Sequence, residues 1–148
     1  MKTFTLVVCG TPRPGGSKTP FFNRRTGKLG VKPDNKHTAK WMSEVRKAAA
    51  EQYDGPLLLG PVYMQYNFRM PRPKIHFRSG KFSHVLKDDA PYWHTNTPDL
   101  TKIIRSTEDA LTGIVYKDDS QVCTRDEVKR YCEVDERPGV IITLYEIQ

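Results

Sequence analysis

Apolar and polar residues recur with regular spacing in six stretches, and the first half of the chain holds three of them. Residues 3–9 (TFTLVVC) are β-branched and apolar, which predicts a strand. In residues 36–52 apolar side chains recur every three or four positions, which predicts a helix. Thr38 can cap this helix. Every second residue from Val62 to Phe68 is apolar, so we expect a strand with one buried face.

The second half predicts one more helix and two strands. Thr97 can cap the helix, with Pro98 in its first turn and Gly113 at its end. A helical spacing of about 100° per residue places an apolar arc toward the core: Leu100, Ile103, Ile104, Thr107, Ala110 and Leu111. A second stripe is expected on the opposite side: Thr101, Arg105, Glu108 and Thr112. Residues 128–134 and 139–147 predict a closing antiparallel hairpin.

Together these elements predict one domain over residues 1–148, of class α/β (α+β), with a small mixed β-sheet packed against two main helices. Two long segments lack periodicity. Residues 10–36 are rich in Gly, Pro and cations, which predicts a surface loop rather than an element. Residues 71–97 combine five Lys/Arg with aromatics and three His. We interpret this second loop as a mobile flap that orders on a phosphate backbone, and a disordered insertion is the alternative.

Charge is distributed unevenly along the chain. The net charge is +7, yet the first 90 residues hold 17 Lys/Arg and 6 Asp/Glu, and the remainder holds 7 and 11. This division fits a protein whose first part binds a polyanion and whose second part acts on it. The alternative is that the charges serve only solubility and have no partner. The longest apolar runs are too short for a membrane span. The three cysteines match no zinc motif, which favours free thiols in a reducing cytoplasm.

Four carboxylates stand out in the acidic part: Asp99, Glu108, Asp118 and Asp119. Magnesium prefers hard oxygen ligands and takes one or two protein carboxylates beside water and phosphate. We therefore expect these side chains to converge on a divalent cation used for hydrolysis. Taken singly, each has an ordinary structural alternative: a charge at a helix start, a solvated helix stripe, and a turn. Asp109 is expected to form a salt bridge or to bond a turn.

The stretch PDLTKIIRSTEDALTGIVYKDDSQV resembles the motifs of RusA-type Holliday junction resolvases, approximately PD-x-D-N-L-x-K, DAL-x-G and DD-x-Q. FTLVVCGTPRPGGSK, HTNTPD and PGVIITLYEI resemble other parts of that family. The resemblance implies a homodimeric α/β endonuclease that nicks four-way DNA junctions symmetrically. It also implies dependence on Mg²⁺, with Mn²⁺ as an alternative. Such enzymes are often encoded by phages or prophages, so the expected location is the cytoplasm of a bacterium or of a phage-infected host.

Within this resemblance, Asp99 falls on the first catalytic Asp of the family and Asp119 on the last, with Asp118 beside it. Arg105 replaces a functional Lys and, being always protonated, could stabilise charge but not act as a base. The second family Asp is replaced by Thr101. We hypothesise that Glu108, two turns further along the same helix face, reaches back to supply the missing ligand.

Phosphate contacts are expected from seven cations, four in the first long loop and three after the strand that ends at Phe68: Lys18, Arg24, Arg25, Lys28, Arg69, Arg72 and Lys74. Tyr92 or Trp93 could stack on an unpaired base, or both could be core aromatics. Three other functions remain open. The chain could be a branched-DNA binder that the Thr101 substitution has weakened, a nuclease for flaps or forks, or a phage accessory protein whose basic surface meets nucleic acid incidentally.

Overall fold

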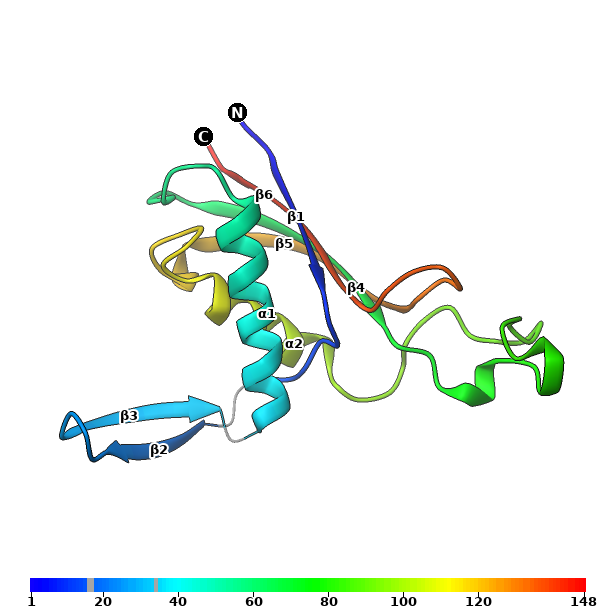
Figure 1. Ribbon diagram of the computed structural model, residues 1–148. Helices are drawn as coiled ribbons and strands as arrows, with labels where there is room; N and C mark the ends of the chain where they lie inside the picture. The colour runs from blue at the N-terminus through cyan, green and yellow to red at the C-terminus, as the bar shows by residue number, and fades with distance from the viewer. Residues whose placement is uncertain (16–17, 34) are drawn as a thin grey trace.

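The computed structural model describes residues 1–15, 18–33 and 35–148. Four strands form a sheet in the order β1-β6-β4-β5, and two helices pack against it (Figure 1). The strands are β1 (Phe4–Cys9), β4 (Val62–Met70), β5 (Val122–Tyr131) and β6 (Gly139–Glu146). The helices are α1 (Lys36–Gln52) and α2 (Leu100–Leu111). This mixed α+β arrangement confirms the predicted fold class.

The pairing of the last two strands differs from the expected hairpin. β4 lies between β5 and β6, parallel to the first and antiparallel to the second. β5 and β6 therefore run in opposite directions, as predicted, but are not neighbours. The connection between them, residues 132–138, spans two strand spacings of about 4.8 Å each. Alternation along each strand specifies its buried face but not its partner, so local pattern could not reveal the inserted strand.

Both helices were predicted at nearly their observed positions, although the residues that cap them differ. Asn35 caps α1, since its side chain accepts a hydrogen bond from the His37 backbone N–H at 2.7 Å. Thr38, the predicted cap, is buried and donates its hydroxyl to the Pro14 carbonyl instead. For α2 the capping position is Asp99 rather than Thr97. The Asp99 carbonyl accepts the first helical hydrogen bonds, which leaves the residues before it outside the helix.

The core lies between the helices and one face of the sheet. β4 contributes Val62, Met64, Tyr66 and Phe68, as its alternation predicts, and the apolar arc of α2 faces them. Glu108 was predicted on the side of α2 away from the core, and this is wrong. It is only 7% exposed, and its carboxylate lies on the core side of α2. Burial of this charge is compensated by the hydrogen bonds described below.

Both long segments contain structure of their own. The predicted loop at residues 10–36 includes a two-stranded hairpin, β2 (Lys18–Asn23) and β3 (Lys28–Pro33), which projects from the domain (Figure 1). The Asn23 side chain accepts two backbone N–H groups of the turn, and Gly27 adopts φ +69°. These turn residues close the hairpin. Local pattern did not reveal the hairpin, because the described side chains of its strands, residues 20–23 and 28–30, show no alternation of buried and exposed positions.

Residues 73–90, which we call the lobe, also project away from the sheet (Figure 1). Backbone hydrogen bonds from Arg78 to Val85 and from Lys87 to His76 fold the lobe back on itself. The disordered alternative for this segment is therefore wrong. Among the described residues no helix is long and apolar enough to cross a membrane. The three cysteines are free thiols, as predicted.

Candidate active site

A tight turn between α2 and β5 presents the acidic pair Asp118 and Asp119. The Asp118 side chain accepts the Ser120 backbone N–H, and the Gln121 side chain accepts the Asp118 N–H, which together form a capping box. The Gln121 amide also donates to the carbonyls of Leu58 and Gly60, at 2.9 Å each. The sequence DDSQ thus builds a rigid turn that is fastened to the segment before β4.

Three carboxylates meet at this turn. Contact with the Asp109 carboxyl, together with burial and the neighbouring Asp118, raises the pKa of Asp119 to about 6. By contrast, the backbone N–H of Ser120 lowers the pKa of Asp118. Asp109 therefore bonds a turn residue, one of the two roles predicted for it. The raised pKa of Asp119 means that its negative charge is disfavoured beside the other two carboxylates, so one proton or one cation at Asp119 would be stabilising.

Glu108 lies next to this group, on the side of the sheet. Tyr66 donates its hydroxyl to the Glu108 carboxylate at 2.7 Å, and Arg125 approaches it at 3.4 Å. Burial raises the pKa of Glu108, whereas the bonds from Tyr66 and Arg125 oppose that rise. Glu108, Asp119 and Glu127 of β5 line one cavity of about 400 Å³. The Oε2 atom of Glu127 is buried and has no hydrogen-bond partner in the described part of the chain.

Asp99 lies at the other end of α2. Its carboxylate pairs with Lys102 at 3.7 Å, and its charge favours protonation of Lys129, whose pKa burial lowers. Lys129 donates to the carbonyls of Asn96 and Pro98 at 2.8 and 2.7 Å. It therefore fixes the chain just before Asp99. Ten residues separate Asp99 from Asp109, which is about 15 Å along a helix axis.

The predicted ligands consequently form two groups within one chain, and not a single cluster. Asp118, Asp119 and Glu108 lie at the C-terminal end of α2, and Asp99 at its N-terminal end. Glu108 is about 10 Å beyond Thr101 along the axis, and its carboxylate is held by other partners, so it does not reach back. Among the described residues, no three His, Cys, Asp or Glu side chains are spaced to hold a metal ion.

Comparison with known proteins settles the family. The family model described as Endodeoxyribonuclease RusA matches residues 11–145. The chain belongs to the RusA endodeoxyribonuclease family. It is also similar to Uncharacterized protein YqaN of Bacillus subtilis (strain 168), with 28% identity over 148 residues and 99% of each chain covered. Members of the RusA family are DNA endonucleases, so both acidic groups on α2 are candidates for phosphodiester hydrolysis.

The cations predicted to contact DNA fall into exposed and structural sets. Arg24, Arg25 and Lys28 are exposed around the hairpin turn, and Arg105 is exposed on α2 between the two acidic groups. Lys74 is exposed in the lobe. Lys18 begins β2, and its side chain lies outside the described part of the structure.

Two of the predicted phosphate contacts are structural instead. Arg69 is 7% exposed and points toward the Val8 carbonyl, which leaves no surface for a phosphate. Arg72 donates to the carbonyls of Cys132 and Pro91, and thereby ties the base of the lobe to the sheet. Both lie at the C-terminal end of β4 and just beyond it, where the chain turns back against the domain. Sequence alone does not distinguish such an arginine from an exposed one.

Several residues of the site were missed by sequence reasoning. Lys129 and Glu127 belong to β5, where they appear as ordinary polar positions of an alternating strand. Only the parallel pairing of β5 with β4 brings them to α2. Tyr92 and Trp93 were left open as core or stacking residues. Trp93 is 56% exposed and Tyr92 is also exposed, so the core interpretation is wrong.

Proposed function

We propose that this protein is a Mg²⁺-dependent endonuclease that cuts four-way DNA junctions as a homodimer. One observation carries the proposal: the two aspartates at the family's first and last catalytic positions, Asp99 and Asp119, lie at opposite ends of α2. About 15 Å of helix between them is more than two short side chains can bridge through one ion. A second copy of the chain, related by twofold symmetry, would bring Asp99 to Asp119 of the partner subunit.

The donor atoms fit a divalent cation of the magnesium type. Asp119, Asp118 and Glu108 offer hard carboxylate oxygens, and Glu127 has a buried oxygen to which no described residue donates. The raised pKa of Asp119 reflects the same excess of negative charge. Magnesium needs only one or two protein carboxylates, so a cage of three in one chain is not required. When bound, the ion would neutralise charge on the reacting phosphate, and Mn²⁺ is the alternative ion.

The remaining residues have separate roles in the proposed site. Arg105, which keeps its charge at all relevant pH values, would orient a phosphate between the two acidic groups. Arg125 and Tyr66 hold the carboxylate of Glu108 in place. Lys129 positions the backbone that carries Asp99. Two such sites related by a dimer axis would place two cuts symmetrically on a junction, in the cytoplasm where the DNA is.

A subunit-mixing experiment tests this proposal. Purified protein is incubated with a labelled four-way junction and a linear duplex, with and without Mg²⁺. Asp99→Asn and Asp119→Asn should each abolish nicking, whereas Asp54→Asn, an exposed carboxylate far from α2, should not. An equal mixture of the two inactive variants should regain about a quarter of the wild-type sites, because half the dimers are mixed and each has one intact site.

Two results would contradict the proposal in different ways. A mixture that stays inactive would show that both aspartates act in one chain or in separate sites. A wild-type protein that shifts the junction on a gel yet never nicks it would favour a branched-DNA binder. The observation in favour of that second function is Thr101, which stands where the family carries a second aspartate.

A further inference from the structure

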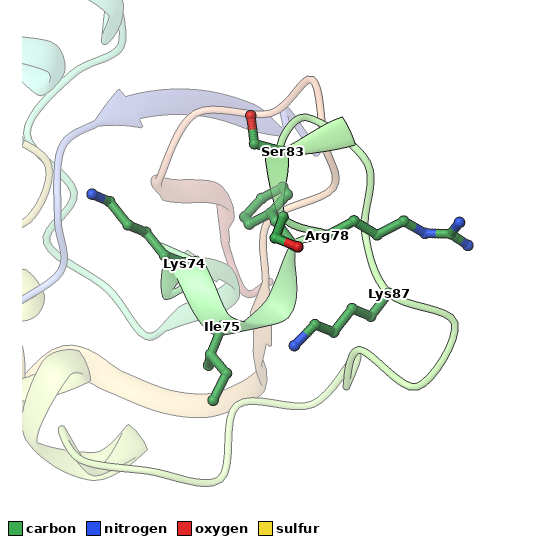
Figure 2. Close-up of a pocket in the computed structure, with 7 residues that line it drawn as sticks. Lys74, Ile75, Arg78, Ser83 and Lys87 are labelled. Atoms are coloured by element: carbon green, nitrogen blue, oxygen red, sulfur yellow. The ribbon is translucent and has the colours of Figure 1, made fainter. Parts of the chain in front are cut away.

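The lobe contains a cavity that the proposed active site does not use. Its volume is about 680 Å³, within the roughly 300–1,000 Å³ typical of small-ligand sites. The walls combine three cations with apolar groups and serines, and the residues that matter here are Lys74, Ile75, Phe77, Arg78, Ser83 and Lys87. Figure 2 shows Lys74, Ile75 and Arg78 on the first part of the lobe and Lys87 on the last part, where the chain runs back toward the sheet.

Two of the three cations lack a counter-charge. Arg78 pairs with Asp88 at 3.1 Å, but among the described residues no carboxylate pairs with Lys74 or Lys87. Burial lowers the pKa of His76, and the charges of Arg72 and Lys87 add to this, whereas the charge of Asp89 opposes it. An anion is therefore the chemical complement of this side of the cavity.

The apolar part of the cavity calls for a second kind of group. Ile75 in the wall is 72% exposed, and Phe77 in the wall is half-buried. A phosphate alone would leave these surfaces in water. A duplex offers phosphates but keeps its base faces stacked, whereas an unpaired nucleotide offers both a phosphate and a free aromatic face.

The lobe is also built to hold its position. Arg72 fastens its base to Cys132 and Pro91, and His76 packs edge-on against Tyr131 at the end of β5. Tyr131 belongs to the same strand as Lys129, which fixes the chain before Asp99. A ligand in the lobe would thus be placed at a constant position relative to the N-terminal end of α2.

We infer that the lobe cavity binds one unpaired nucleotide of a DNA strand, with the phosphates on its two sides against Lys74 and Lys87 and its base against Phe77. The inference rests on the proposed action on branched DNA and adds a reason for the preference. A base pair at the crossover of a branch has lost continuous stacking and opens more readily than one inside a linear duplex, and the nucleotides of an opened pair are unpaired. The lobe would therefore select branched over linear DNA, independently of the metal-dependent cut.

Fluorescence anisotropy with a labelled dT decamer tests this, in EDTA so that no cleavage is needed. Lys74→Ala/Lys87→Ala should weaken binding about tenfold, and Phe77→Leu, which keeps an apolar side chain but removes the aromatic ring, should do so to a similar degree. Arg46→Ala/Lys47→Ala is the matched control: it removes two exposed charges from α1 and should have little effect. An abasic decamer should bind the wild type about as weakly as the lobe variants bind dT.

The inference would be overturned if both double variants lost the same affinity, or if the abasic strand bound the wild type as tightly as dT. A linear duplex serves as the third probe, and its affinity should change less than that of dT in the lobe variants. Because no metal is present, these outcomes are separate from the nicking assay. A protein that never cuts junctions could still show the lobe site, and an active nuclease could lack it.

Discussion

Replacing Glu136 with glutamine should lower the free energy of unfolding by about 3 kcal/mol at pH 7. Glu136 and Arg130 form a two-pronged ion pair, with N–O distances of 2.7 and 2.9 Å, and the Glu136 carboxylate also accepts the Glu133 backbone N–H. Hydrogen bonding from Arg130 holds the pKa of Glu136 at about 2, below its usual 4.5. Each pKa unit corresponds to about 1.4 kcal/mol, which gives the figure above.

The loss of unfolding free energy caused by Glu136→Gln should depend on pH in a defined direction. Because the pKa of Glu136 is lower in the folded state, its stabilisation is complete above about pH 5 and is lost as pH falls toward 2. At pH 3 about 1 kcal/mol of the stabilisation from Glu136 should remain. The pair clasps the connection between β5 and β6, so its loss should destabilise the end of the sheet on which the lobe rests.

Urea unfolding followed by circular dichroism, at pH 7 and at pH 3, measures the loss of unfolding free energy at each pH. The melting temperature at pH 7 should fall by about 6–12 °C for a chain of this size. Glu133→Gln is the control, since it removes a nearby exposed charge without breaking a side-chain bond to Arg130. Equal stability of the two variants at pH 7, or a Glu136→Gln deficit that persists unchanged at pH 3, would refute the reasoning.

Three further predictions concern the site. Lys129→Met removes the hydrogen bond to the Asn96 carbonyl and should misplace Asp99. Single-turnover junction cleavage should slow about 100-fold, and junction affinity in a gel shift should be nearly unchanged. Tyr66→Phe removes a donor from buried Glu108 and should cost about 1–3 kcal/mol of unfolding free energy in urea at pH 7. A smaller loss would mean that Arg125 suffices. Trp93→Ala should leave stability within about 0.5 kcal/mol but weaken binding to a labelled four-way junction about fivefold, and unchanged affinity would exclude stacking.

Local periodicity alone determined both helices and the buried face of β4. The predicted helix at residues 36–52 coincides with α1, because a 17-residue pattern of apolar positions and a clear stop leave little freedom. Val62 to Phe68 alternate onto the core as predicted. The motifs of α2 and of the turn that follows likewise made the family recognisable from the sequence, since their residues are neighbours along the chain.

Tertiary structure decided where the charged groups point and which of them meet. Glu108 and Arg69 look like exposed polar residues in the sequence, yet both are buried. Tyr66 from β4 bonds the Glu108 carboxylate, whereas Arg69 makes one long contact of 3.5 Å to the Val8 carbonyl of β1, and its Nε has no partner among the described residues. The insertion of β4 between β5 and β6 brings Glu127 and Lys129 to opposite ends of α2. A helix of 12 residues keeps Asp99 away from Asp119. Such contacts join residues far apart in the chain, and a local pattern contains no record of them.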